Sequence, residues 1–292
     1  MSKVDDNGGY SLPFKLGKLH ATPARPKLRF ASLTAGLPAP AASVDFYSEV
    51  TDWPMYLNDR YGDCVWAGFG HHIEQITRYG QGATVEVTDA DVETGYESTG
   101  FRPDDPNTDQ GTNVEDGLSY WRKTGVGGHA IVAYAAVDVS NATELKQAVS
   151  LFGALGIGFN VPAYAMDQFS AGKPWDVQKS NASIIGGHYV VVVGYDAKYL
   201  YVVTWAKIQK MTWAFFRKFC DEAYVIIDDE MVSKVSQYAG GTDLHAFGEE
   251  FASLTGEANP FPVVPTPQGV TAAEAASVAR SALDEALKGL GL

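Results

Sequence analysis

The chain has 292 residues, 46% of them hydrophobic, and a formal net charge of −13 at pH 7. This length fits one large domain or a main domain with appendages. The acidic balance argues against broad nucleic-acid binding, which needs a basic surface. No stretch approaches the ~20 apolar residues of a membrane-spanning helix, and the polar start of the chain does not resemble a secretory signal.

We therefore expect no nucleic-acid partner, no membrane partner, and a cytoplasmic or particle-associated protein. The two cysteines, Cys64 and Cys220, are too few for a disulfide framework in a chain this long. They fit a reducing compartment.

Residues 1–45 are rich in Pro, Gly and Ala and predict an extended, partly ordered arm. Between Lys15 and Arg29 the arm carries basic residues and no acidic ones. We interpret it as a solvated arm that wraps the body, with docking to an acidic partner as the alternative.

Residues 46–238 predict the main domain. Helices come early in it and strands late, which favours an α+β fold with a segregated helical side. Thr88 and Thr143 are the expected N-caps of the second and fourth helices. We expect helices over 63–79, 88–98, 113–124 and 141–151, and strands over 131–138, 155–161, 189–195, 200–205 and 223–227.

An acidic loop lies between the second and third expected helices. Asp105, Asn107 and Asp109 alternate there as calcium ligands do, and Asp116 is the twelfth residue counted from Asp105, but the glycine of the calcium-loop pattern falls one place too late. A solvated acidic loop is the favoured interpretation, and no metal site or cofactor is predicted.

The last part of the chain changes character. Gly-Gly followed by four prolines predicts a linker over residues 239–269. Thr271 and Glu274 form a capping box for an amphipathic helix over residues 270–292. Because so short a helix is marginal alone, we expect it to dock on its own body or on another subunit, in an oligomer or larger assembly.

Cys64 and His188 carry the chemistry of the chain. Cys64 lies where a turn opens into a helix, and the helix N-terminus stabilises a thiolate. His188 lies at the start of an apolar strand, where an imidazole can activate the thiol. Asn58 precedes the cysteine by six residues. Its amide, with the backbone N–H of Cys64, can donate to a developing oxyanion.

These residues resemble the papain-like cysteine peptidases over about residues 45–230. That family has a Gln six residues before its catalytic Cys, an aromatic-Ala pair after it, and a His that begins a hydrophobic strand ending in Gly-Tyr. The matches here are Asn58, Cys64, Trp66-Ala67, His188 and Val191–Tyr195. The resemblance implies a papain-like fold, with a helix carrying Cys64 packed on an antiparallel β side carrying His188. It also implies a peptide or protein substrate.

The sequence departs from the family pattern in three places. Asn58 replaces the longer Gln, and Trp66 lies two residues after the cysteine, where the family has its aromatic at the next position. The family's Asn or Asp, about sixteen residues after the histidine and before a Trp, falls on Val203 or Thr204. Valine cannot orient an imidazole, whereas threonine offers one hydroxyl.

Gln209 and Asp63 are alternative orienting groups. The resemblance implies Cys64 as nucleophile, His188 as base and then acid, and Asn58 as oxyanion donor. Thr204 is the expected orienting residue, and Trp66 and Trp205 are the expected binding residues, with Trp205 shielding the histidine.

Three functions stay open at this point. The first is a cysteine hydrolase of the peptidase type, with full, reduced or lost activity. The second is a non-catalytic structural or assembly protein, such as a phage virion component. The chain loosely resembles uncharacterised papain-like proteins of actinobacteria and their phages. The third is a simple peptide-binding module.

Overall fold

The computed structural model describes residues 14–22, 27–34, 37–179, 183–228 and 242–261, with side chains from residue 245 in the last range. It also places a short strand pair, β1 (Lys3–Val4) and β2 (Tyr10–Ser11). The helix expected over 270–292 lies outside the described residues. Within the described part, no helix is long and apolar enough to cross a bilayer.

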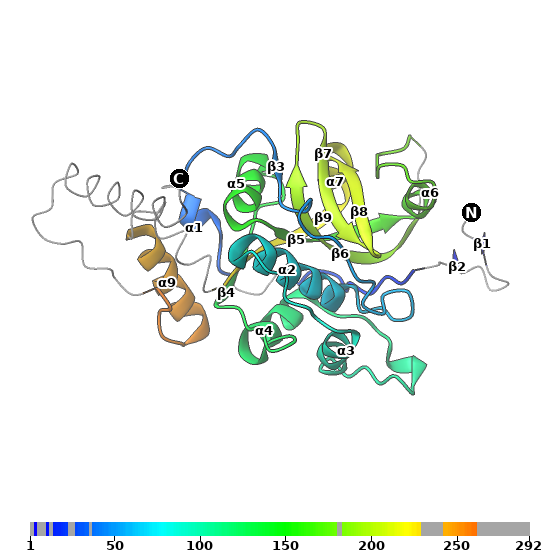
Figure 1. Ribbon diagram of the computed structural model, residues 1–292, viewed down its shortest axis with the longest axis horizontal. Coiled ribbons are helices and arrows are strands. Elements are labelled where there is room, and N and C mark those ends of the chain that lie inside the picture. Colours follow the sequence, from blue (N-terminus) through cyan, green and yellow to red (C-terminus); the bar gives the residue numbers. More distant parts are fainter. Residues whose placement is uncertain are drawn as a thin grey trace, which may run out of the picture. The chain divides into compact units, whose positions relative to one another are not determined.

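Helices and strands follow one another in the order that Figure 1 shows. The helices are α1 (Ala31–Thr34), α2 (Cys64–Gln81), α3 (Asp89–Glu97), η1 (Pro106–Thr108), α4 (Val114–Thr124), α5 (Ala142–Phe152), α6 (Tyr164–Ser170), α7 (Trp213–Phe219) and α9 (Thr242–Thr255). The strands of the body are β3 (Val44–Asp45), β4 (Ala133–Ala136), β5 (Leu155–Pro162), β6 (Ile184–Tyr195), β7 (Tyr199–Thr204), β8 (Lys207–Thr212) and β9 (Cys220–Ile227).

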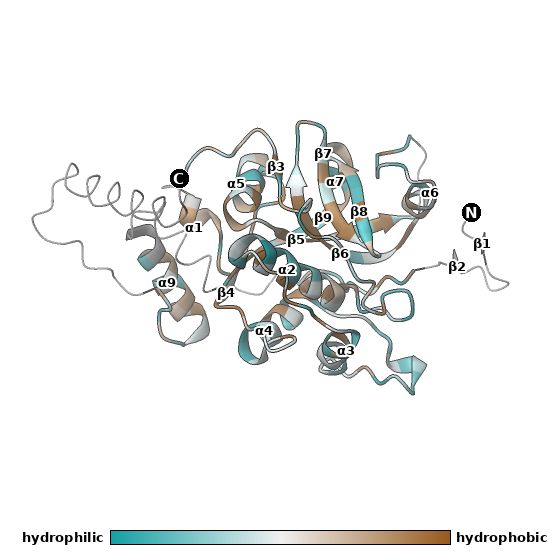
Figure 2. Ribbon diagram, viewed as in Figure 1, coloured by the Kyte–Doolittle hydropathy of each residue, from teal (hydrophilic) through white to brown (hydrophobic). Residues whose placement is uncertain are grey.

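An antiparallel sheet forms the centre of the body. Its strand order is β4-β9-β5-β6-β7-β8, and β3 pairs with the end of β6. In Figure 2 the central strands carry mostly hydrophobic residues, whereas β8 at the edge carries more hydrophilic ones. The mixed composition of β8 and its position at the edge explain why no apolar run marked it in the sequence.

Strand β6 explains how the two sides of the fold meet. Successive side chains of a strand point to opposite faces. Tyr189 and Val191 accordingly join the hydrophobic cluster built with α2, α3 and α4. Val190 and Val192 join the cluster built with α5, α6 and α7. The valine run is uninterrupted because both faces are buried, and the expected α+β fold, with the Cys64 helix on an antiparallel sheet, is confirmed.

Two capping predictions had different outcomes. Thr88 caps α3 and forms a reciprocal capping box with Asp91, as predicted. The prediction of Thr143 as cap of α5 is wrong. The cap is Asn141, whose side-chain oxygen accepts a hydrogen bond from the N–H of Glu144 at 3.2 Å, so Thr143 lies inside the helix.

The predicted linker over 239–269 is wrong in its first half, because α9 lies within it. Phe247 and Phe251 are four residues apart and therefore on one helix face, and both are buried. Phe261 is buried as well, with its ring 5.8 Å from that of Phe247. The first proline of this stretch, Pro260, comes after the end of α9 at Thr255 and just before Phe261.

Carboxylates of the acidic loop are used inside the protein. Asp105 accepts a hydrogen bond from the backbone N–H of Asn107 at 3.0 Å and caps η1. Asp109 accepts from the N–H of Gly62 at 2.8 Å and from the Tyr96 hydroxyl at 2.6 Å. The loop is thereby fixed against the turn that precedes Cys64.

Candidate active site

Cys64 is the first residue of α2 and is 1% exposed. Its thiol lies beside β6, within hydrogen-bonding reach of the backbone of Tyr189, the residue after His188. Burial raises the pKa of Cys64 to about 12, although hydrogen bonds from the backbone of Tyr189 and of Gly17 act in the opposite direction. In this state the thiol is therefore neutral at physiological pH.

His188 is held from two sides by the β7–β8 hairpin. Its Nε2 lies 2.7 Å from Oγ1 of Thr204, and its ring stacks on Trp205 with centroids 4.4 Å apart and planes at 19°. Nδ1 is buried without a hydrogen-bond partner among the described residues. Burial lowers the pKa of His188 to about 3, so the imidazole is neutral.

Side-chain contacts distinguish the alternative orienting residues. Val203 points into the cluster around α2, whereas the Thr204 hydroxyl contacts the histidine. Gln209 donates to the carbonyls of Lys173 and Lys210 at 2.8 and 3.2 Å. Asp63 accepts from Asn58. Neither alternative residue contacts the imidazole, whereas Thr204 does.

Asn58 differs from the expected oxyanion donor in this state. Its side-chain Nδ2 donates to the carbonyl of Tyr61 at 3.1 Å and to Oδ1 of Asp63 at 2.9 Å. Both amide hydrogens are therefore used. Burial raises the pKa of Asp63 well above its usual value, against the effect of the Asn58 hydrogen bond.

Trp66 does not line a binding surface, so its prediction as a binding residue is wrong. It is fully buried, and its indole N–H donates to Oγ1 of Thr112 at 2.9 Å. The family resemblance placed an aromatic near the cysteine, but position 66 on α2 points into the core. Trp66 instead fixes the loop containing Thr112, which forms one wall of the site.

Residues 14–22 of the N-terminal arm cover both halves of the site, and we call them the cleft segment. Its backbone bonds to three separate parts of the body: Lys15 N–H to the carbonyl of Asn58 (2.9 Å), Lys18 N–H to that of Gly187 (3.1 Å), Leu19 N–H to that of Thr112 (3.0 Å), and Thr112 N–H to that of Gly17 (2.7 Å). Phe14 stacks on Trp205 with centroids 5.0 Å apart. The cleft segment is thus bound along the site rather than solvated, and the prediction of a solvated arm is wrong here.

Gly17 is essential to this arrangement. A Cβ at this position would overlap the backbone carbonyl of Gly62, which cannot move as a flexible side chain does. The backbone of Gly17 thereby reaches the Cys64 thiol. A glycine between Leu16 and Lys18 in a basic arm was the available signal in the sequence, but nothing in it indicated which surface the glycine approaches.

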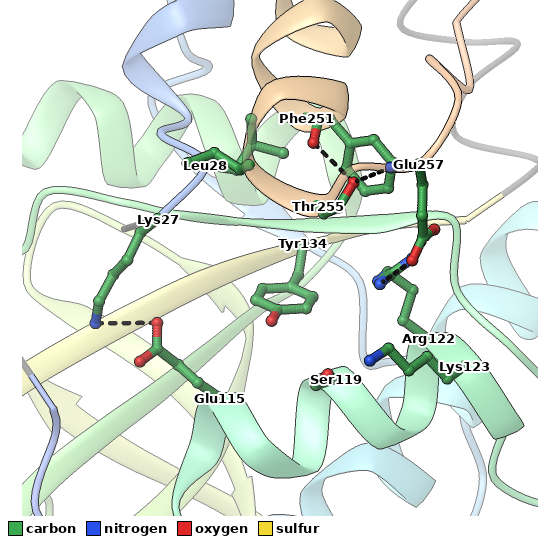
Figure 3. A pocket seen from close by; sticks show the side chains of 11 residues that line it. Lys27, Leu28, Glu115, Ser119, Arg122, Lys123, Tyr134, Phe251, Thr255 and Glu257 are labelled. Carbon is green, nitrogen blue, oxygen red and sulfur yellow. Dashed lines mark hydrogen bonds and ion pairs between the residues drawn. The ribbon is translucent and has the colours of Figure 1, made fainter. Parts of the chain in front are cut away.

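A separate pocket of about 310 Å³ lies between α4 and α9 (Figure 3). Lys27, Arg122, Tyr134 and Phe251 contribute to its lining. Neither Cys64 nor His188 lines it, so this pocket is separate from the candidate active site.

The comparisons with known proteins bear on the fold. No protein-family model and no curated sequence matches the chain. Among solved structures, xylellain, a cysteine protease from Xylella fastidiosa, is 15% identical, with 74% of this chain and 97% of that chain covered and a TM-score of 0.59. Recombinant stem bromelain precursor is 15% identical (74% and 78% covered, TM-score 0.49). Procathepsin B from Trypanosoma congolense is 13% identical (73% and 86% covered, TM-score 0.49). The likeness to xylellain, together with the arrangement of α2 on the antiparallel sheet, shows that this chain has a divergent papain-like fold.

Proposed function

We propose that the protein is a cysteine hydrolase of peptide-type bonds whose active site is kept at rest by its own cleft segment. The observation that carries the proposal is the His188 geometry. Nε2 is engaged by Thr204 at 2.7 Å, Trp205 fixes the ring plane, and Nδ1 is left unpaired. An imidazole held in this way, on the residue before the Tyr189 backbone that contacts the Cys64 thiol, is suited to take the thiol proton.

The chemistry follows from these positions. With its proton on Nε2, His188 accepts the Cys64 proton at Nδ1, and the thiolate attacks the substrate carbonyl carbon. The backbone N–H of Cys64 has no partner within α2, because helix-start N–H groups lack one, and it can donate to the oxyanion. His188 then returns the proton to the leaving amine, the C–N bond breaks, and the acyl group stays on Cys64 as a thioester. Water, deprotonated by His188, hydrolyses the thioester and restores the thiol.

The resting state follows from burial. Both Cys64 and His188 are neutral because the cleft segment removes water from them, and desolvation disfavours each charged form. Departure of the segment returns water to both groups, which lowers the thiol pKa and raises the imidazole pKa. A thiolate–imidazolium pair becomes accessible only then.

A non-catalytic role is the alternative, because the cleft already holds a peptide segment through its backbone. A binding or assembly protein, such as a virion component, would use the cleft in the same way without needing a reactive thiol. The reactivity of Cys64 distinguishes the two functions.

The test is the pH dependence of Cys64 alkylation in the wild-type chain and in Gly17→Val, with Cys64→Ser as the blank for Cys220. In the wild type we expect slow labelling that rises only toward pH 12, the value set by burial. In Gly17→Val the segment cannot seat. We expect labelling at pH 7 to be about a hundredfold faster and to titrate below ~8.5, the value of a free thiol.

Adding His188→Ala to Gly17→Val should abolish the low-pH labelling, and adding Thr204→Val should reduce it less. Leu19→Val is the matched control, because the Leu19 side chain is 45% exposed and its backbone bonds persist. Labelling of Gly17→Val with an ordinary thiol titration, unchanged by His188→Ala in a chain with native circular dichroism, would contradict the hydrolase proposal and favour a binding protein.

A further inference from the structure

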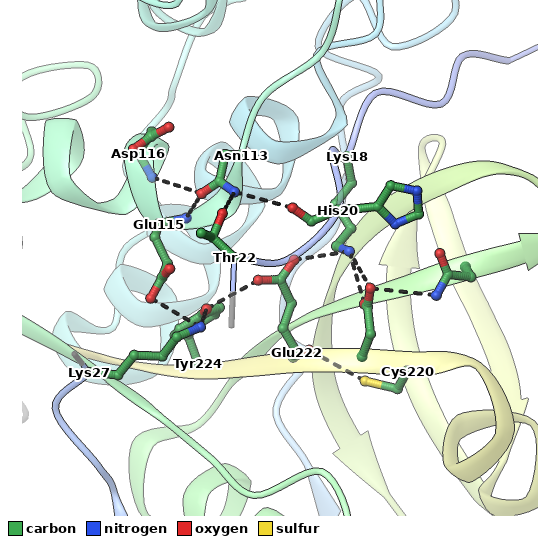
Figure 4. A network of polar contacts seen from close by, with 12 residues as sticks. Lys18, His20, Thr22, Lys27, Asn113, Glu115, Asp116, Cys220, Glu222 and Tyr224 are labelled. Carbon is green, nitrogen blue, oxygen red and sulfur yellow. Dashed lines mark hydrogen bonds and ion pairs between the residues drawn. The ribbon is translucent and has the colours of Figure 1, made fainter. Parts of the chain in front are cut away.

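Lys18, next to the glycine at the thiol, enters a buried acidic pocket (Figure 4). Its ammonium lies 2.8 and 2.9 Å from the two carboxylate oxygens of Asp221 and 3.0 Å from Oε1 of Glu222. The Lys18 side chain is 0% exposed and that of Glu222 is 4% exposed. Burial alone would lower the pKa of Lys18, but the two carboxylates raise it above its usual value, so the group stays charged.

The pocket belongs to the body of the protein and is shaped for a long side chain. Asp221 and Glu222 lie at the start of β9, and Gly158 on the neighbouring strand β5 forms the floor. A Cβ at Gly158 would overlap the aliphatic part of Lys18, and one at Gly187 would overlap the Lys18 carbonyl. The absence of side chains at these two positions makes the space that the lysine fills.

Further polar groups hold the carboxylates in place. The Tyr224 hydroxyl donates to Oε2 of Glu222 at 3.1 Å, and Lys27 donates to that hydroxyl at 3.0 Å. Asn160 lies 3.5 Å from Oδ2 of Asp221. Residues of the body thus contact both carboxylates in addition to Lys18.

Departure of the cleft segment would leave the carboxylates of Asp221 and Glu222 without their lysine partner in a largely buried pocket. Such charges are costly without a partner. The vacated pocket therefore favours another cationic side chain over an apolar or acidic one, and it lies one residue along the cleft from Cys64.

We propose that Asp221 and Glu222 form a specificity pocket for a lysine or arginine side chain of the substrate, one residue from the residue that faces Cys64. This inference rests on the proposed hydrolase function and adds the substrate class to it. Lys18 occupies the pocket in the resting state, so the cleft segment and a basic substrate compete for the same carboxylates.

Hydrolysis in the full-length Gly17→Val chain tests the pocket. The substrates are internally quenched peptides in which a Gly corresponds to Gly17. Lys, Arg, Leu or Glu is placed directly before this Gly in one series and directly after it in the other. We expect kcat/KM for the Lys and Arg peptides to exceed that for Leu by roughly ten- to hundredfold, the range for charge-assisted pairs, and Glu to be poorest. Asp221→Asn with Glu222→Gln should remove this preference, so that kcat/KM for the Lys and Arg peptides falls to within about twofold of that for the Leu peptide in the same variant, since the charged pairing is lost. The exposed Glu97→Gln is the matched charge control.

A binding measurement separates failure of the pocket from failure of the hydrolase. A synthetic peptide of residues 14–22 is titrated calorimetrically into the chain carrying Gly17→Val and Cys64→Ser. Replacing Lys18 by Met in the peptide should weaken binding by at least tenfold, whereas replacing Lys15, which is exposed, should change it little. Equal binding of the two replaced peptides, or a preference for Leu substrates, overturns the pocket. Lysine-dependent binding without hydrolysis of any peptide sustains the pocket and overturns the hydrolase.

Discussion

The cleft segment and the C-terminal segment, residues 242–261, both pack on the body, but by different physical means. The cleft segment uses mainly backbone hydrogen bonds to Asn58, Thr112 and Gly187 and the buried Lys18 ion pairs, with one aromatic contact at its end, Phe14 on Trp205. The C-terminal segment uses buried aromatic rings, Phe247 and Phe251, and one ion pair at its margin.

This difference indicates which segment can exchange. Backbone hydrogen bonds and a lysine in an acidic pocket can be replaced by another peptide of suitable sequence, because every peptide carries the same backbone groups. Buried phenylalanines have no such substitute, and exposing them is costly. We expect the cleft segment to be displaceable and α9 to stay part of the core.

Lys18→Met should have the largest effect, because it weakens the attachment of the cleft segment to the body. It leaves the largely buried Glu222 and Asp221 without their cation, which costs about 3 kcal/mol for a broken buried pair. Amide exchange at Lys18 and Leu19, which donate to Gly187 and Thr112, should accelerate by roughly a hundredfold, and Cys64 should alkylate faster. Lys15→Met is the control, and equal exchange in both variants would mean that the ion pairs do not hold the segment.

Phe247→Ala should weaken α9 and leave the active site unchanged. The side chain is fully buried, and its truncation costs about 3 kcal/mol through lost contacts and the cavity left behind. Urea unfolding and amide exchange in α9 measure this loss. The alkylation rate of Cys64 should stay within about twofold of the wild type, within the effect of a surface substitution. A large increase in that rate would show that the two segments are coupled.

The smallest effect is expected for Arg122→Met. Arg122 makes a bidentate pair with Glu257 at 2.6 and 2.8 Å, but the Glu257 side chain is 48% exposed. Solvent screening limits such a pair to about 0.5 kcal/mol. The urea midpoints of the wild type and the variant should differ slightly at low salt and converge at high salt, because salt screens the wild-type pair. A loss of several kcal/mol in the free energy of unfolding would place this ion pair among the main contacts of α9.

Much of the body follows from local patterns in the sequence. The spacing of Trp66, Phe69 and Ile73 predicts one face of α2, and the run before Tyr195 predicts β6. Local patterns failed where flanking residues concealed an element. Glycines and prolines surround α9, and the polar residues of β8 mask its pairing with β7. A family motif also failed at Trp66, because the presence of an aromatic residue near the cysteine does not fix the direction in which the aromatic side chain points.

By itself, the sequence determined the main helices of the helical side, the place of Cys64 at a helix start and the apolar strand that follows His188, because these depend on periodicity and capping within a few residues. The structure extends that strand back to Ile184, so His188 lies inside β6 and not at its entrance. Only the tertiary structure decided that Thr204 contacts the imidazole, that Asn58 is tied to Asp63, and that residues 14–22 cover the thiol. Those contacts join residues far apart in the chain or turn on the direction of one side chain, and no local pattern encodes either. The acidic pocket around Lys18 has the same origin, because its cation and its carboxylates are separated by 203 residues or more.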